Sequence, residues 1–249
     1  MVRKFDFWYA AAADNRRIHL YLPDDYDSSQ ERYAVLYMFD GHNLFFDYDA
    51  TFGKSLGLKE FLDGWWKKLI VVGIECAHDD ITRVREYSPF DIDSYIYGHI
   101  NGRGHHTFEW IVNDLKPYID SHYRTWPQRE ATAIAGYSMG GMMSLYGVLW
   151  HNSVFSKAAV ISPAFRPAMG TFSSAIPRLP ISADTRVFFS WGTQELADEN
   201  DLEERIRKVE ELIMAHGART YLYRNEGGIH NEASWQHEVP CWMKFLWED

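Results

Sequence analysis

The stretch that decides the fold is ATAIAGYSMGGMMSLYGVLW, residues 131–150. Its first residues are small or apolar, as expected of a buried strand, and its second half has the composition of a buried helix. Between the two lies GYSMG, residues 136–140, which matches the Gly-x-Ser-x-Gly pattern of a tight strand-to-helix turn. On such a turn the serine hydroxyl projects from the edge of the sheet, and the glycines leave space where a Cβ would clash. We therefore predict Ser138 as a nucleophile, with a purely structural turn as the alternative.

The rest of the chain alternates short apolar runs with longer amphipathic segments, which is typical of α/β proteins. Some runs, such as LIVVGIE at residues 69–75, are continuously apolar, which indicates strands covered by helices on both faces. The pattern predicts strands at Phe5–Ala10, Ile18–Leu22, Tyr33–Phe39, Leu69–Glu75, Ala131–Gly136, Ala158–Ser162, Arg186–Trp191 and Thr220–Arg224. It predicts helices at Thr107–Tyr123, Met139–Trp150, Asp198–His216 and Glu232–Trp247.

These elements predict an α/β-hydrolase fold: a mostly parallel, eight-stranded-type sheet with an antiparallel edge, helices on both faces and no large lid. Neither Gly-x-Gly-x-x-Gly after the first strand nor a P-loop is present, which argues against a dinucleotide or nucleotide site. Because no repeat or polar linker divides the chain, we expect one domain over residues 1–249. The connection from Ser162 to Thr185 is irregular and too short for a large lid. We expect it to form one wall of the pocket, and the loop from Ala77 to His106 the opposite wall.

Composition excludes several classes of function. The formal net charge of −10 argues against nucleic acid or an anionic membrane surface as a partner and leaves a small molecule. No run approaches about 18 apolar residues, and Asp6 interrupts the apolar N-terminus, so neither a membrane span nor a signal peptide is expected. Cys76 and Cys241 lie far apart and form no metal or redox spacing. Because no secretion signal is expected, we predict both as reduced thiols in a cytoplasmic protein. The pattern leaves the oligomeric state open, a homo-oligomer included.

The candidate base is one of three histidines after the strand at residues 186–191, since the base follows the acid in this fold. His216 ends a charged helix and is expected to cap it, and His237 falls within the last predicted helix. His230 lies in GGIHNEASW directly after the final strand, where the glycines allow a turn that aims its imidazole at Ser138. We predict His230 as the base, with a surface-loop histidine as the alternative.

The candidate acid follows the strand RVFFSWG, in the segment GTQELAD at residues 192–198. A carboxylate directly after this strand can hydrogen-bond to the histidine and hold it in one tautomer. Glu195 lies nearest the strand end and is the predicted acid. Asp198 is the alternative, although Asp198 and Glu199 look like the cap and first turn of the next helix.

A negatively charged oxygen in the reaction needs two backbone N–H donors. One is predicted at Met139, directly after the serine, where the start of a helix also favours negative charge. The other is predicted at His42, in the segment DGHN that follows the strand at residues 33–39, with Gly41 as the alternative.

Three further side chains are candidates for contact with a substrate: Asp40, Trp191 and Trp235. Asp40 follows a strand and could contact a polar group or satisfy nearby N–H groups instead. The two tryptophans lie close in sequence to the predicted acid and base, and core packing is the alternative for both.

His99, His105 and His106 gather in GHINGRGHHTF, residues 98–108. A metal site would need ligands at fixed spacing on regular structure, whereas this segment is rich in glycine. We therefore predict a solvated loop here rather than a ligand cluster, and neither a metal ion nor an organic cofactor for the protein.

Several segments together resemble the esterase family that includes esterase D and carbohydrate esterase family 1. They are LYMFDGHNLF, VVGIE, REYSP, FEWIVNDLKPYIDSHYRT, IAGYSMGG, GTQE and GIHNEASW, which appear in this order over most of the chain. The resemblance implies a catalytic triad of Ser138, Glu195 and His230, and an oxyanion donor within residues 40–42. Residues 85–87 match a signature of the family, and we expect them to brace the site without a catalytic role.

The resemblance implies a broad range of substrates, because the family is similar in fold across feruloyl and acetylxylan esterases, siderophore esterases, S-formylglutathione hydrolases and mycolyltransferases. A glutamate as the acid looks more like the siderophore-esterase and mycolyltransferase branches. We expect a serine carboxylic-ester hydrolase that acts through an acyl-enzyme on small polar or sugar-linked esters. The alternatives are an acyltransferase and a catalytically silent binding protein of the same fold.

Overall fold

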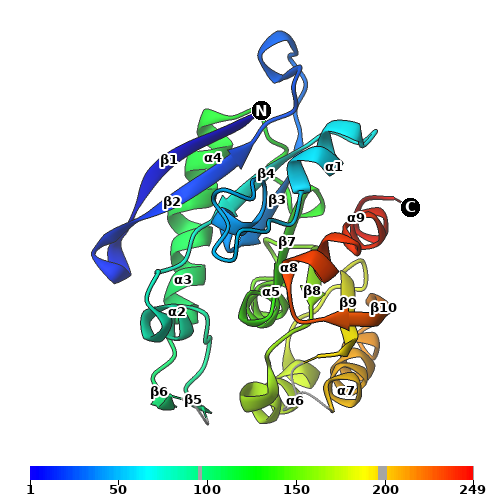
Figure 1. Cartoon of the computed structure of the whole chain (residues 1–249). Helices are drawn as coiled ribbons and strands as arrows, with labels where there is room; N and C mark the ends of the chain where they lie inside the picture. The colour runs from blue at the N-terminus through cyan, green and yellow to red at the C-terminus, as the bar shows by residue number, and fades with distance from the viewer. Residues whose placement is uncertain (95–96, 196–200, 249) are drawn as a thin grey trace.

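The computed structural model describes residues 1–94, 97–195 and 201–248. Within them, eight strands form one sheet in the order β1-β2-β4-β3-β7-β8-β9-β10 (Figure 1). The strands are β1 (Val2–Tyr9), β2 (Asp14–Tyr21), β3 (Ala34–Phe39), β4 (Leu69–Ile74), β7 (Thr132–Tyr137), β8 (Lys157–Ile161), β9 (Arg186–Gln194) and β10 (Arg219–Ile229). β2 pairs antiparallel with both β1 and β4, and the other neighbours are parallel. The predicted α/β-hydrolase sheet with an antiparallel edge is confirmed.

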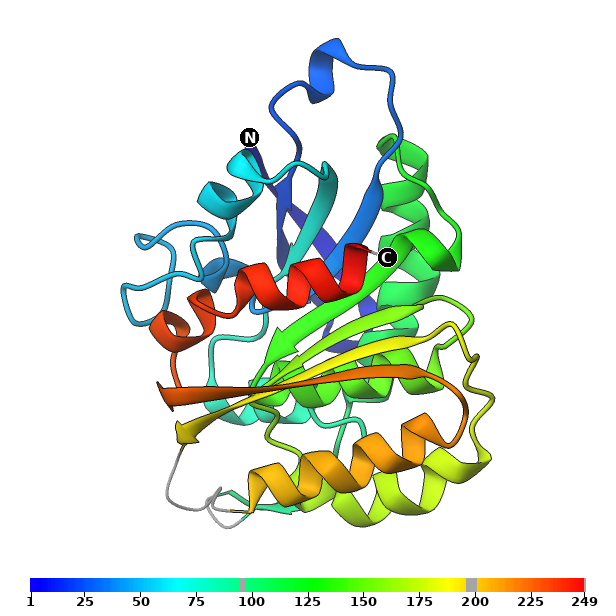
Figure 2. The ribbon, with the colours of Figure 1, turned by 90° about the vertical axis from the view of Figure 1, so that its right-hand side faces the viewer.

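Helices cover both faces of this sheet, as Figure 2 shows. One core lies under α3 (Gly104–Trp110), α4 (Lys116–His122), α5 (Met139–Trp150), α6 (Met169–Ala175) and α7 (Leu202–Met214). The core on the opposite face lies under α1 (Leu58–Gly64), α8 (Glu232–Gln236) and α9 (Val239–Trp247). On β3, Tyr37 and Phe39 enter the first core and Leu36 and Met38 enter the second, because successive side chains of a strand alternate between faces. This is why the central strands are apolar on both sides.

Three predicted helices have different limits from those expected. The helix predicted at Thr107–Tyr123 begins at Gly104 and runs through α3, a π-helical segment at Ile111–Leu115, and α4. The helix predicted at Glu232–Trp247 is broken into α8 and α9, and Pro240 occupies the first turn of α9, where its missing N–H is tolerated. The helix predicted at Asp198–His216 corresponds to α7, which runs from Leu202 to Met214. Asp198 and Glu199 lie outside the described residues.

The segment from Ser162 to Thr185 was predicted to be irregular, and this is wrong. It contains the 3₁₀ turns Arg166–Ala168 and Ile176–Arg178 on either side of α6. Phe172 and Ile176, four residues apart, are fully buried and belong to the core that α7 also covers. Burial of this helical face offsets the weak local propensity of the segment.

Shorter elements complete the chain around the sheet. They are the 3₁₀ turns Ala10–Ala12, Tyr26–Ser28, Gly41–Asn43 (η3) and Arg129–Ala131, the helix α2 (Asp80–Glu86), and the hairpin strands β5 (Ile92–Ser94) and β6 (Gly98–Ile100). No helix within the described ranges has both the length and the apolar character needed to cross a membrane.

One buried carboxyl group, that of Glu238, lies where α9 begins. The residue is 0% exposed, and Asn225 on β10 donates a hydrogen bond to its Oε1 at 2.8 Å. Burial raises the pKa of Glu238 to about 7, against opposing interactions with Ser190 and Asn225. Between the ordinary glutamate pKa and about 7, the folded chain therefore keeps a proton that the unfolded chain has lost. The free energy of unfolding falls as pH rises through this window.

We expect Glu238→Gln to stabilise the protein at pH 8 and to have little effect at pH 5. The amide cannot ionise and can keep the Asn225 contact, so the gain at pH 8 should approach about 3 kcal/mol, the equivalent of the pKa shift. Urea unfolding at the two pH values measures it. Glu211→Gln, at an exposed position on α7, is the matched control and should change neither value. Equal effects of Glu238→Gln at both pH values would contradict the prediction.

Candidate active site

The turn at Ser138 joins β7 directly to α5. Ser138 has φ of 57° and ψ of −123°, a strained conformation for a residue with a Cβ. A Cβ on Gly136 would lie 2.5 Å from the carbonyl carbon of Gly140, so the turn closes this tightly only with glycine. The Ser138 N–H donates to the Ile161 carbonyl at 3.0 Å, and Ala164 N–H donates to the Ser138 carbonyl at 3.0 Å. Neighbouring backbone at the end of β8 thus holds the strained turn in place.

Three side chains predicted from the sequence form one hydrogen-bonded chain. His230 Nε2 lies 2.9 Å from Ser138 Oγ, and His230 Nδ1 lies 2.6 Å from Glu195 Oε2. The second carboxylate oxygen, Oε1, accepts a hydrogen bond from the Gly192 N–H at 2.9 Å. The side chains of His230 and Glu195 are 14% and 5% exposed, so water competes little for either contact. The structure therefore brings together the three groups that nucleophilic catalysis by a serine requires.

Glu195 is held as a carboxylate. Burial raises the pKa of its side chain, but hydrogen bonds from His230, the Gly192 N–H and Ser162 outweigh burial, and the pKa lies below its ordinary value. The group is therefore ionised at neutral pH and accepts a hydrogen bond from the Nδ1–H of His230. With the proton at Nδ1, Nε2 is left as the acceptor that faces Ser138.

The two candidate oxyanion donors lie at the starts of helical segments, where N–H groups have no partner within the helix. Met139 is the first residue of α5, and His42 is the second residue of η3. A Cβ on Gly41 would lie 2.6 Å from the carbonyl carbon of Gly73 on β4, so glycine lets η3 pack directly on the sheet. His42 Nε2 lies 3.0 Å from Thr51 Oγ1, which fixes the imidazole, and burial lowers the pKa of that ring.

A cavity of about 300 Å³ opens beside Ser138 and His230. Its other walls come from three stretches of chain: residues 40–52, residues 76–83, and residues 231–235. The predicted wall at residues 77–106 is therefore present in part, through Ala77, His78, Asp80 and Arg83. The predicted wall at residues 162–185 is wrong, because none of these residues lines the cavity.

Asp40 lines the cavity, but its carboxylate is already occupied. Arg83 Nη2 donates to Oδ2 at 3.1 Å and to Oδ1 at 3.2 Å, and the Asp40 side chain is only 2% exposed. The Asp40 N–H donates to the Tyr87 hydroxyl at 3.1 Å. The carboxylate therefore pairs with an arginine rather than with nearby N–H groups, and Tyr87 braces the strand end as expected.

Of the two tryptophans predicted to contact a substrate, only Trp235 lines the cavity. It stacks on Tyr137 with ring centroids 4.3 Å apart, and donates from Nε1 to Ser162 Oγ at 2.9 Å. Its ring also meets the His230 ring edge-on at 4.9 Å. Trp191 does not line the cavity and is 4% exposed within the core under α7, so a substrate-binding position for Trp191 is wrong.

The histidine-rich segment is not a solvated loop throughout. His105 and His106 lie in the first turn of α3, and His99 lies in β6, where it contacts Asp93. In the described part of the chain, the group with metal-ligand spacing is instead Asp40, His42 and Cys76, whose candidate ligand atoms lie within 4.8 Å of one another. The Arg83 guanidinium already neutralises Asp40 there, so a metal ion would have to compete with it.

Sequence reasoning did not single out three charged groups of the cavity: Asp80, Arg83 and Glu232. Glu232 is 6% exposed, accepts a hydrogen bond from Asn43 Nδ2 at 3.1 Å, and has a pKa raised by burial. Its position two residues after His230 was a signal that could have been used. Arg83 lies on a helix that was not predicted, and nothing in the local pattern distinguishes it from a surface arginine.

Solved structures of ester hydrolases have the same fold. A ferulic acid esterase is 16% identical with a TM-score of 0.70, over 99% of this chain and 97% of that one. An IroE-like serine hydrolase from Shewanella oneidensis is 20% identical with a TM-score of 0.75, over 96% of this chain and 78% of that one. The enterobactin esterase Fes from Shigella flexneri is 14% identical with a TM-score of 0.76, over 100% of this chain and 59% of that one.

Curated sequences include bacterial relatives. The uncharacterized protein YbbA from Bacillus subtilis is 25% identical over 202 residues, which are 79% of this chain and 75% of that protein. Esterase Rv1288 from Mycobacterium tuberculosis is 29% identical over 161 residues, 64% of this chain but 32% of that protein. The family model described as "Putative esterase" matches residues 10–244, nearly the whole chain. The chain therefore belongs to this esterase family and is a carboxylic ester hydrolase.

Proposed function

We propose that the protein is a serine esterase that hydrolyses small polar or sugar-linked acyl esters through an acyl-enzyme formed on Ser138. The observation that carries the proposal is the continuous hydrogen-bonded chain from Glu195 through His230 to Ser138. This geometry matches the nucleophile, base and orienting acid of serine hydrolases.

In the proposed mechanism, His230 Nε2 takes the proton of Ser138 Oγ as the oxygen attacks the ester carbonyl. The N–H groups of Met139 and His42 would stabilise the oxyanion, and Glu195 would stabilise the imidazolium. The protonated His230 then gives its proton to the leaving alcohol, and the acyl group remains on Ser138. A water molecule activated by His230 releases the acid and restores the enzyme.

The polar lining of the cavity supports esters with hydroxyl groups as substrates. Asn43, His42, Arg83 and Glu232 supply donors and acceptors, while Trp235 and Tyr137 supply an aromatic wall. Feruloyl and siderophore-type esters combine polar groups with an aromatic ring, and acetylated sugars carry hydroxyl groups; two structural neighbours are named as ferulic acid and enterobactin esterases.

The test is labelling with a fluorophosphonate, which reacts only with an activated serine, followed by hydrolysis of a panel of esters. We expect labelling of the wild-type protein at Ser138 and none after His230→Ala. The panel comprises p-nitrophenyl acyl esters, methyl ferulate and acetylated xylo-oligosaccharides. Added alcohols distinguish the acyltransferase alternative, because transfer would give a new ester in place of the free acid. A protein that neither labels nor turns over any ester would contradict the proposal.

We also propose that the protein works in the cytoplasm on a small-molecule ester, without nucleic acid or a membrane as partner. Cys76 and Cys241 are both free thiols, which supports a reducing compartment, and the net charge of −10 disfavours polyanions. Fractionation of cells that express the full natural chain tests the location.

A further inference from the structure

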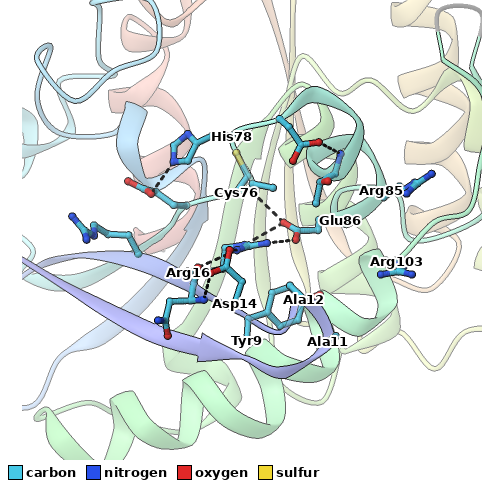
Figure 3. Close-up of a pocket in the computed structure, with 16 residues that line it drawn as sticks. Tyr9, Ala11, Ala12, Asp14, Arg16, Cys76, His78, Arg85, Glu86 and Arg103 are labelled. Carbon is cyan, nitrogen blue, oxygen red and sulfur yellow. Dashed lines mark hydrogen bonds and ion pairs between the residues drawn. The ribbon is translucent and has the colours of Figure 1, made fainter.

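A second cavity lies beside the one that contains Ser138. It has a volume of about 460 Å³ and is lined by β2, α2, the strand end of β4 and Arg103, which precedes α3 (Figure 3). Both cavities are lined by Cys76, Ala77 and His78, so this segment is their common wall. The His78 side chain is 72% exposed, so it can give way to a ligand. A substrate long enough to cross this segment would occupy both cavities.

Four carboxylates and four arginines line the second cavity, and one buried arginine, Arg16, contacts two of the carboxylates, Glu86 and Asp14. Arg16 and Glu86 form an ion pair in which the two side chains are 7% and 6% exposed (Figure 3). Arg16 Nη1 also donates to Asp14 Oδ2 at 3.0 Å. Neither carboxylate is therefore left to bind a cation from solution.

The two other carboxylates of this cavity also have partners. Glu75 lies between two imidazoles, with His19 Nε2 at 2.8 Å from one oxygen and His78 Nε2 at 3.2 Å from the other. Asp79 is the N-cap of α2 and accepts a hydrogen bond from the Thr82 N–H at 2.9 Å. Every carboxylate in the lining thus has a partner within the described chain.

The four arginines of the lining fall into two groups, two with a carboxylate partner and two without one among the described residues. Arg16 pairs with Glu86, and Arg17 pairs with Asp6 at 2.8 Å, while Arg85 and Arg103 make no side-chain hydrogen bond or ion pair with any described residue. Both are exposed, and the Arg103 N–H donates to the Arg85 carbonyl at 2.7 Å, which fixes the two backbones side by side. In Figure 3 they lie together on the same side of the Arg16–Glu86 pair.

A shortage of acidic residues does not explain why Arg85 and Arg103 have no carboxylate partner among the described residues. The chain has 35 acidic and 25 basic residues, so partners for two arginines are abundant. The field of a protein with net charge −10 repels anions in general, and an anion would need a local pair of donors to be held. The guanidinium groups of Arg85 and Arg103, which lie on neighbouring backbones, provide such a pair, because each presents a planar fork that fits a carboxylate or a phosphate.

We propose that the second cavity binds an anionic group, a carboxylate or a phosphate, that the substrate carries some distance from its ester, through Arg85 and Arg103. This inference rests on the proposed ester hydrolysis at Ser138. It gives a role to Arg85, which the sequence analysis placed in a family signature without a function, whereas Glu86 and Tyr87 of the same signature are structural.

The experiment compares anionic esters with neutral esters of the same shape. One series has the charge on the acyl side: half-methyl esters of dicarboxylic acids of increasing length, each paired with its terminal amide. The other has it on the alcohol side: acetate esters of hydroxyalkanoic acids of increasing length, again paired with amides. In one series we expect a chain length at which the wild type hydrolyses the carboxylate-bearing ester with a kcat/KM about tenfold above that of its amide-bearing partner.

The double variant R85Q/R103Q should lose this preference. It should still hydrolyse the ester bond of the neutral, amide-bearing compounds at the wild-type rate. R17Q is the matched control, because Arg17 lines the same cavity but already pairs with Asp6, and it should keep the preference. Phosphate-bearing esters of the preferred series and length separate the two anions, since a phosphate site would favour them over the carboxylates.

No acid preference in either series, or a preference that R85Q/R103Q retains, would overturn the inference. Fluorophosphonate labelling of Ser138 and hydrolysis of the neutral, amide-bearing esters are measured on the same preparations. If both persist, the anion site is wrong while the serine esterase stands. If both are absent in the wild type, the proposed function itself has failed.

Discussion

Ser138→Ala is expected to lower ester hydrolysis by about 10⁴-fold or more while the protein stays folded. Ser138 Oγ contacts His230 Nε2 at 2.9 Å, and the backbone of the turn is held by Ile161 and Ala164 rather than by the side chain. Loss of the hydroxyl therefore removes the nucleophile but none of the contacts that form the turn. Initial rates on a p-nitrophenyl ester and a thermal melt of the same preparation measure the two effects.

Ser144→Ala is the matched control for this variant. Ser144 lies on α5, the helix that directly follows Ser138. It is fully buried and donates to the Gly140 carbonyl at 2.8 Å, so its loss should cost a little stability but little turnover. Residual activity of Ser138→Ala within about tenfold of the wild type would mean that another group attacks the ester. The assignment of Ser138 would then fall, although the fold would be unaffected.

Glu195→Gln is expected to lower kcat by up to roughly 10⁴-fold with the shape of the site preserved. In the wild type, Oε1 accepts from the Gly192 N–H and Oε2 faces His230 Nδ1. In the variant the amide oxygen is retained by the Gly192 N–H, so the amide nitrogen faces Nδ1 and donates to it. His230 then carries its proton on Nε2, the atom that must accept the proton of Ser138.

Asp198→Ala is the comparison for this prediction, because Asp198 is the alternative acid and lies outside the described residues. If Asp198 caps the helix that follows, its loss should cost about 1 kcal/mol of stability and leave turnover nearly intact. Turnover and urea unfolding of both variants decide the matter. A large loss of kcat in Asp198→Ala with a nearly active Glu195→Gln would assign the acid to Asp198.

Local pattern was enough to predict the elements on which catalysis is proposed to depend. The continuously apolar strands, the Gly-x-Ser-x-Gly turn and the chain order of serine, glutamate and histidine follow from steric and burial rules that act over a few residues. Ser138, Glu195 and His230 each follow a strand, and parallel strands bring such positions to the same edge of a sheet. Sequence reasoning could therefore bring these three side chains together without any knowledge of distances.

The walls of the two cavities depended on contacts between distant segments. Trp191 and Trp235 looked equivalent in sequence, yet one lies in the core under α7 and the other lines the cavity beside His230. The helical form of residues 166–178 and the pairing of Asp40 with Arg83 arise from burial against elements far along the chain. Arg17 has a carboxylate partner and Arg85 has none among the described residues, and this difference depends on which carboxylate the packing brings within about 4 Å. Such contacts follow from the arrangement of the whole sheet and its helices, and no local periodicity encodes them.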